Sequence, residues 1–279
     1  MIDLSQLPPP DVVEALDFEK VYEEIRAAFA SFYPEHDLLL ESDPAIKLLE
    51  LAAYREIQIR ARINDAARAV MLAYATGADL DNLAAIFDTK RLGGESDASL
   101  RARAQLAPER YTVAGSVGSY IYHGLSADAN VADISAISPQ PGSVTIYVLS
   151  RIGNGAASEE LLATVSAMLN AESIRPMTDS VTVQSANIVS YAVQAELIMQ
   201  PGPDASVVLD AANAAIQTYT SAQHAMRRDV TLSGIYAALH QPGVQRVNLI
   251  APIADIVIGD GEASYCTGLT VTVPEATDV

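Results

Sequence analysis

The longest regular pattern of apolar and polar positions lies between residues 44 and 74. Apolar side chains recur there at alternating steps of three and four residues, which is typical of a helix with one apolar stripe. Ser42 or Asp43 can cap the start, and Pro44 suits a first helical turn. The pattern predicts a helix from Pro44 to Tyr74, which at about 30 residues would be about 45 Å long. We expect Gly77 to end this helix as a left-handed C-cap.

The apolar stripe of this helix is a heptad seam that Glu56 interrupts. The positions that we expect to contact partner helices are Leu49, Ala52, Ile59, Ile63, Ala66 and Val70. A shorter helix is predicted over residues 18–32, and it can cover only part of the stripe. One interpretation is a helical hairpin inside a single domain. The other, which we favour, is that the long helix packs against helices of other chains.

Two further short helices are predicted before residue 110. Leu80, Leu83 and Phe87 follow a helical spacing after Gly77. The glycine pair at 93–94 then breaks the chain, and Ser96 or Asp97 can cap a third helix. Residues 1–10 end in three consecutive prolines and are expected to form an extended lead, and the chain from there to about residue 110 is expected to be helical.

Beyond residue 110 the pattern mixes strands with helices. The expected strands are 131–137, 143–149, 181–183, 191–199, 244–250 and 269–273, with a further one at 256–258. The expected helices are 115–125, 158–170, 204–221 and 232–240. Gly259-Asp-Gly261 is typical of a hairpin turn. This order indicates small units in which helices cover one face of a sheet.

The predicted fold class is therefore α+β, with three regions. A long-helix region spans residues 1–110, and two tandem α+β modules span residues 111–188 and 189–279. The amino-acid sequence of residues 119–134 resembles that of residues 233–247. We therefore expect two related modules in which the same helices and strands follow one another in a shifted order.

The composition of the chain limits the classes of molecule that it can bind. The chain has 279 residues and a formal net charge of -18, so a phosphate backbone would repel it, and we expect no nucleic-acid partner. Arginines gather at residues 55–68, but acidic residues alternate with them, as on a solvated or salt-bridged helix face. No apolar run approaches the roughly 20 residues that span a bilayer. The N-terminus has neither a basic start nor an apolar core, so we expect no membrane insertion, no secretion signal and synthesis in the cytosol.

The side chains that could carry chemistry are scattered. Four histidines (His36, His123, His224 and His240) lie far apart, and Cys266 is the single cysteine, so we expect no metal site. Asp79 and Asp81 resemble a carboxylate pair, but acidic residues are also expected at a helix start. We therefore expect no catalytic residue and no cofactor, and we interpret the chain as an interaction protein.

Two segments of the sequence are distinctive enough to compare with known protein families. Residues 76–84 read Thr-Gly-Ala-Asp-Leu-Asp-Asn-Leu-Ala, and residues 94–103 read Gly-Glu-Ser-Asp-Ala-Ser-Leu-Arg-Ala-Arg. Together with residues 138–151, 175–183 and 229–247, they resemble sequences of the baseplate J-like family. That resemblance covers nearly the whole chain, from about Leu4 to Val273.

The resemblance implies a structural part of the baseplate wedge in a contractile phage tail or a related bacteriocin. It implies a second copy of the chain in each wedge and a helical bundle with the baseplate I-like protein. The lysozyme-like (W-like) wedge protein, the hub, the tube and the sheath would lie nearby, and the ring of wedges would rearrange on contraction. Two alternatives remain open, a cell-wall-degrading tail enzyme and an assembly chaperone that is absent from the finished particle.

Overall fold

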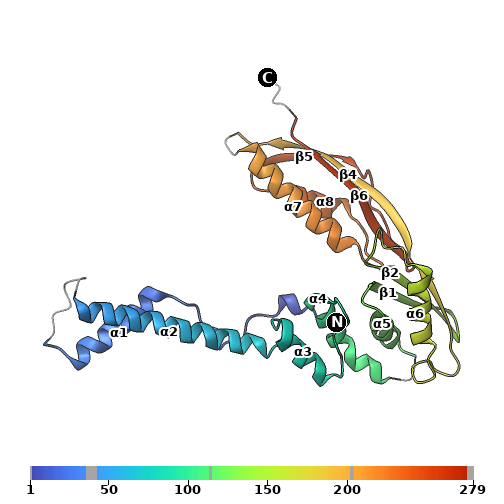
Figure 1. Ribbon diagram of the computed structural model, residues 1–279. Coiled ribbons are helices and arrows are strands. Elements are labelled where there is room, and N and C mark those ends of the chain that lie inside the picture. The colour runs from blue at the N-terminus through green and yellow to red at the C-terminus, as the bar shows by residue number, and fades with distance from the viewer. Residues whose placement is uncertain (1, 36–42, 113–114, 202–203, 275–279) are drawn as a thin grey trace. The chain divides into compact units, whose positions relative to one another are not determined.

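The computed structural model describes residues 2–35, 43–112, 115–201 and 204–274. These residues divide into two units, one of residues 1–91 and 95–105 and the other of residues 92–94 and 106–279. The first unit is helical, and the second contains both sheets. The predicted α+β class is confirmed (Figure 1).

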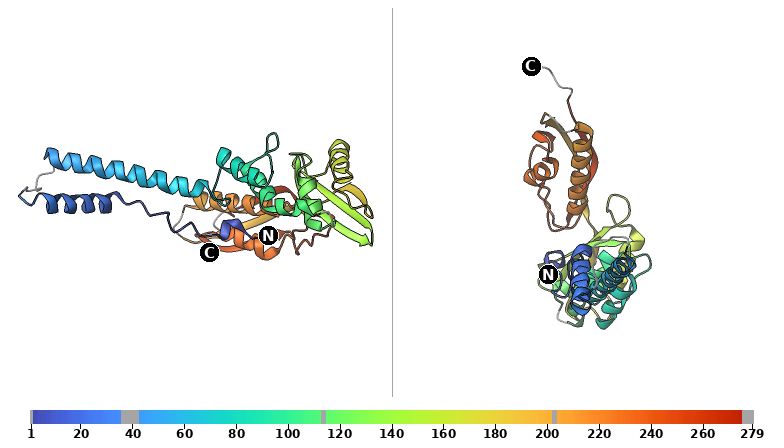
Figure 2. Two further views of the ribbon diagram at one scale, coloured as in Figure 1. Left: turned by 90° about the horizontal axis from the view of Figure 1, so that it is seen from below. Right: turned by 90° about the vertical axis from the view of Figure 1, so that its left-hand side faces the viewer.

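The helical unit begins with an extended lead that contains one 3-10 turn. Its helices are α1 (Phe18–Phe32), α2 (Pro44–Ala69), α3 (Gly77–Ile86) and α4 (Asp97–Leu106). The Asp17 carboxylate caps α1 by accepting the Lys20 N–H, and Asp43 caps α2 by accepting the Ala45 N–H at 2.8 Å. The other cap candidate, Ser42, lies outside the described residues. Figure 2 shows α1 beside the first part of α2.

The long helix is shorter than predicted. It ends at Ala69, and Val70 is its C-cap, so the prediction that it reaches Tyr74 is wrong. Gly77 does adopt the left-handed conformation, with φ of +54°, but it begins α3 and does not end α2. The physical reason is a tertiary contact, because the guanidinium of Arg101 binds carbonyl groups of the segment between the two helices.

The second unit starts with a 3-10 helix (Ala107–Tyr111) and then builds its first sheet. The elements are α5 (Val117–Leu125), β1 (Val131–Gln140), β2 (Ser143–Ser150), α6 (Glu159–Leu169) and β3 (Ser180–Ser185). Strand β2 is central, antiparallel to β1 and parallel to β3. Helix α5 packs on β1 and α6 packs on β3, which places the core between helices and sheet.

The second sheet has the same pairing with its elements in another order. They are β4 (Asn187–Met199), α7 (Ala205–Gln223), α8 (Leu232–Leu239), β5 (Val244–Ala251) and β6 (Glu262–Thr272). Strand β4 is central, antiparallel to β5 and parallel to β6. Each central strand leads into a helix, and each antiparallel edge strand follows a helix. The predicted shifted repeat of elements is therefore confirmed at the level of topology.

Two local predictions in this sheet are wrong. Residues 256–258 form no strand, since Ile256 makes only an isolated bridge to Val230. The turn at Gly259–Gly261 exists, with Glu262 N–H donating to the Gly259 carbonyl, but it is not a hairpin turn. It leads into β6, which pairs with the distant β4 in parallel. Pairing between strands so far apart in sequence leaves no local signal.

A small cluster joins the two sheets of this unit. Leu149, Ala186, Met226 and Ala263 pack together and are buried. Beside them, Asp133 of β1 accepts the backbone N–H of Met226 at 2.9 Å. Burial raises the pKa of the Asp133 carboxyl. The linker Ala186 donates its N–H to Val148, so the chain passes between the sheets without a free segment.

The tight packing at this junction allows a prediction of how much one added methyl group, in Gly155→Ala, lowers the stability of the fold. Gly155 has φ of +100°, and a Cβ there would lie 2.6 Å from Cδ1 of Leu149 and 2.9 Å from the His224 ring. Strain and overpacking together should make Gly155→Ala lower the free energy of unfolding by about 2–4 kcal/mol. Denaturant titration of the purified chain measures this. Gly153→Ala is the matched control, because Gly153 has φ of +67° but open space around it. An equal loss in both variants would contradict the packing argument.

Candidate protein-interaction surface

Helix α1 covers one side of the first half of α2. Ile46 and Leu49 of α2 are buried against Tyr22, Ile25 and Phe29 of α1. Leu49 was predicted to face a partner helix, but it is only 9% exposed and packs inside its own chain. At this first position of the seam, the single chain makes the contact that a helical hairpin would make.

The extended lead continues along the second half of α2. The side-chain amide of Asn64 binds the backbone of Glu14 twice, accepting its N–H at 3.1 Å and donating to its carbonyl at 2.9 Å. Arg60 pairs with the Glu14 carboxylate at 3.2 Å and also with Glu56. Tyr74 donates its hydroxyl proton to the Leu7 carbonyl. These contacts of the lead with α2 and with Tyr74 are polar.

Another face of α2 is apolar and exposed. Leu48, Leu51, Tyr54, Ile59, Ile63 and Val70 have between 50% and 69% of their surface exposed. The seam positions Ala52 and Ala66 are exposed as well. Five of the six predicted seam residues therefore lie on the surface, while Leu49 does not. A row of large apolar side chains on one helix is a feature of surfaces that bind another protein.

Basic side chains flank this face. Arg55 and Arg62 lie one helical turn before and after Ile59, and together with Gln58 and Asp65 they line a shallow groove. The apolar part of the groove is Ile59 and Ala61, and its charged side chains are two arginines and one aspartate, on a chain whose net charge is -18. Such a surface suits an apolar helix that carries acidic side chains.

The signature stretch, residues 76–103, holds the base of this long helix. Leu80, Ala84 and Leu100 are fully buried in a small core between α3 and α4. Next to it, Arg103 and Glu95 form an ion pair in which both nitrogen–oxygen distances are 2.7 Å. Their side chains are only 3% and 2% exposed. Arg103 also donates to the Lys90 carbonyl at 2.7 Å, so this guanidinium ties the loop before α4 to α4 itself.

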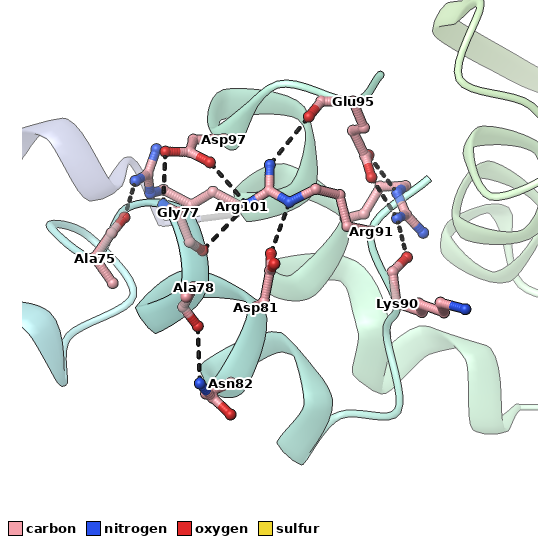
Figure 3. Close-up of polar contacts among 11 residues, drawn as sticks. Ala75, Gly77, Ala78, Asp81, Asn82, Lys90, Arg91, Glu95, Asp97 and Arg101 are labelled. Atoms are coloured by element: carbon pink, nitrogen blue, oxygen red, sulfur yellow. Dashed lines mark hydrogen bonds and ion pairs between the residues drawn. The ribbon is translucent and has the colours of Figure 1, made fainter. Parts of the chain in front are cut away.

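A second arginine connects the starts of α3 and α4 (Figure 3). Arg91 contacts Asp81 at 2.6 Å and Asp97 at 2.7 Å. Asp97 in turn accepts the N–H of Gly77 at 3.0 Å. The carboxylate pair that sequence reasoning considered, Asp79 and Asp81, therefore has structural roles, since Asp79 lies in the first turn of α3 and Asp81 binds Arg91.

The third arginine fixes the end of α2. Arg101 donates from Nε to the Leu72 carbonyl at 2.7 Å. It also donates from Nη2 to the Ala75 carbonyl (Figure 3). These carbonyl groups follow the last turn of α2, where they have no helical partner. The long helix is thus held at its base by side chains of the signature stretch.

The Gly77–Asp97 contact predicts a pH dependence. The backbone N–H of Gly77, and then Arg91, lower the pKa of Asp97. A carboxyl whose pKa is lower in the folded state stabilises the fold above its ordinary pKa, and this contribution is lost as pH falls through the folded value. We therefore expect the Tm of the helical unit to fall with pH below the ordinary aspartate range. Asp97→Asn should lower the Tm at neutral pH and reduce this dependence, as measured by thermal unfolding between pH 2 and pH 6. Identical slopes in both proteins would contradict this role.

The remaining chemical candidates stay apart. His123 is half-buried on α5, where burial lowers its pKa, and His224 contacts the Ser264 carbonyl in the other sheet region. Burial raises the pKa of the Cys266 thiol. Among the residues that the structure describes, no group of three or more His, Cys, Asp or Glu side chains could hold a metal ion. No described helix is long and apolar enough to cross a membrane.

The exposed apolar face of α2 is typical of the class of proteins that bind other protein chains. Three consecutive segments match family models: the baseplate J-like N-terminal domain at residues 41–94, the central domain at 112–185 and the C-terminal domain at 191–272. The chain is also 52% identical to baseplate protein J of Escherichia phage P2, over 96% of each chain. It therefore belongs to the baseplate J-like family and is a phage-tail baseplate protein.

A solved structure gives a more distant likeness. The baseplate of the anti-feeding prophage, a cryo-EM structure symmetrised six-fold, contains a chain that is 11% identical. The match has a TM-score of 0.34 and covers 92% of the present chain. It covers 54% of the chain in that structure, so the present chain spans about half of it.

Proposed function

We propose that the chain is a wedge subunit of a contractile-tail baseplate, and that the exposed face of α2 joins it to helices of other chains. The observation that carries this proposal is the row of exposed apolar side chains on α2, in particular Ile59 and Ile63, which Val70 continues at the C-cap. Burying a side chain of this kind contributes about 1.5–3 kcal/mol before the cost of association. A helix that its own chain covers on one side gains this energy when another chain covers the exposed face.

The proposal extends to the partners. A second copy of the chain and a baseplate I-like protein would contribute the helices that cover α2. The lysozyme-like (W-like) wedge protein, the hub, the tube and the sheath would be neighbours in the assembled ring. The division into a helical region (residues 1–110) and two modules (residues 111–188 and 189–279) gives each copy separate faces for different neighbours, as a closed ring needs. The role is structural, without catalysis.

Co-expression with the adjacent tail genes, followed by native mass spectrometry, tests the proposal. A stable complex that contains this chain and an I-like partner is the expected result. Recovery of the chain alone under all combinations would contradict it. Two further measurements separate the alternatives: cell-wall zymography should show no clearing by the purified chain, and mass spectrometry of finished particles should detect the chain. A chaperone would be missing from those particles.

A further inference from the structure

The four edge strands of the two sheets differ in how they are protected against pairing with another chain. Natural edge strands carry charges, prolines or bulges that prevent such pairing. Strand β1 contains Pro139 and two register irregularities, β5 contains Arg246 and two irregularities, and β6 begins with Glu262 and contains one irregularity. Strand β3 reads Ser-Val-Thr-Val-Gln-Ser, with no charge and no proline, and its register with β2 is uninterrupted.

The outer edge of β3 offers free backbone groups. Ser180 donates its N–H to the Gly142 carbonyl at 2.7 Å, and Ala186 donates to the Val148 carbonyl at 2.9 Å. Even-numbered residues of β3 therefore face β2, and the N–H and C=O groups of Val181 and Val183 point to the outer edge. Within the described part of the chain, no strand pairs with this edge.

The hydrophobic core beneath β3 is also open on this side. Val181 and Val183 of β3 and Leu162 of α6 pack against the core but are only partly buried. On the opposite edge of the same sheet, Val131 and Ile134 of β1 are 2% and 3% exposed. The core is thus closed at β1 and incomplete at β3, where an added strand would cover both the backbone and these side chains.

We propose that β3 is a docking edge for a second copy of this chain, which adds its own β3 in antiparallel orientation across a two-fold axis. This inference rests on the proposed function, because it names the surface through which the second copy binds. Pairing Thr182 with Thr182 places Val181 opposite Val183, so valines meet on the core face and polar side chains meet on the other face. The resulting sheet has six strands in the order β1-β2-β3-β3-β2-β1.

The lack of charge on β3 makes this edge compatible with a second copy as the occupant. Two chains with a net charge of -18 repel each other over most of their surfaces, and residues 180–185 form an edge without charge. Antiparallel self-pairing there brings no like charges opposite one another. Thr182–Thr182 is also a favourable cross-strand pair. The nearest rival is the end of β6, where Leu269, Thr270 and Val271 show a similar alternation.

Cysteine cross-linking distinguishes pairing through β3 from pairing through β6. Because Thr182 would lie in a non-hydrogen-bonded pair, its Cα atoms would be about 4.5 Å apart, which a disulfide can span. In a Cys266→Ala background, Thr182→Cys should give a disulfide-linked dimer under mild oxidation, both as purified chain and in assembled tails. Thr270→Cys, on the exposed face of β6, is the matched control and should remain monomeric. If Thr270→Cys formed the dimer and Thr182→Cys did not, the assignment to β3 would be overturned. It would also be overturned if Thr182→Cys formed no cross-linked dimer in either preparation.

Charge reversal tests the two-fold symmetry. Thr182 is exposed, so Thr182→Lys and Thr182→Glu should each leave the fold intact by circular dichroism. Each variant alone should lose self-association in analytical ultracentrifugation, because like charges would face each other across the axis. An equal mixture of the two should recover it. Unchanged association of either variant, or no recovery in the mixture, would refute β3 pairing. Binding of helical partners to α2 should be unaffected, so failure here is distinct from failure of the proposed function.

Discussion

Arg103→Ala is expected to lower the free energy of unfolding of the helical unit by about 3–5 kcal/mol, because it leaves the Glu95 carboxylate buried without its partner. Both side chains are almost completely buried, so water cannot replace the lost contact. The change also removes the hydrogen bond to the Lys90 carbonyl, which holds the loop before α4. Thermal and denaturant unfolding of the variant measures this loss.

Two controls locate the effect in the buried pair. Arg103→Lys keeps the charge but not the two parallel hydrogen bonds to Glu95, so it should also destabilise the unit, though less. Arg62→Ala removes an exposed arginine from α2 and should change stability by less than about 0.5 kcal/mol. If Arg103→Ala were as mild as Arg62→Ala, the ion pair would not be holding the base of the long helix.

Ile59→Asp combined with Ile63→Asp is expected to abolish binding of partner helices to α2. Both side chains are at least half exposed in the single chain, so the fold of the chain should tolerate the change. In a complex, the double variant no longer buries two apolar side chains at the interface, and it places two unpaired carboxylates there instead. A loss of about 4 kcal/mol or more corresponds to about a thousandfold weaker binding. Pull-down of the co-expressed partner with the double variant measures this.

The matched control places the same charges elsewhere. Val207→Asp with Val257→Asp also replaces two exposed apolar side chains, on α7 and in the loop before β6. That variant should bind partner helices as the unaltered chain does. Circular dichroism and limited proteolysis should show that the two α+β modules stay folded in both variants. Equal complex formation by all three proteins would contradict the role of the α2 face.

Much of the local structure could be predicted because its causes are local. The cap at Asp43, the proline at position 44 and the apolar spacing of residues 18–32 all lie within the elements that they specify. The strand β2 follows from β-branched residues between two turns. The topology of β6 could not be predicted in this way, because its partner β4 lies more than sixty residues earlier.

The signature stretch shows the same limit in more detail. The sequence of this stretch predicts where its helices start. It does not predict that Arg103 pairs with Glu95, or that Arg101 binds the carbonyls of Leu72 and Ala75, because these contacts depend on tertiary structure. The helix end at Ala69 follows from these contacts and not from local propensity. The sequence indicates this buried ion pair only through a glutamate just before a predicted helix and an arginine eight residues later.

The same reasoning applies to the seam of α2. Sequence periodicity predicted one apolar stripe, while the structure has two apolar sides, one packed on α1 and the other exposed. Leu49 belongs to the covered side, and Ile59 and Ile63 belong to the exposed side. Periodicity alone cannot decide which side a helix of the same chain will cover.

Oxidative footprinting of α2 tests the central claim most directly. Hydroxyl radicals would label the side chains of Ile59, Ile63 and Val70 in the free chain and in purified assembled tails, with mass spectrometry as the readout. The account predicts strong labelling of these three residues in the free chain and protection in the tail, while Val257 serves as the exposed reference within the same samples. Equal labelling of the α2 face in both states would contradict the claim that assembly covers it.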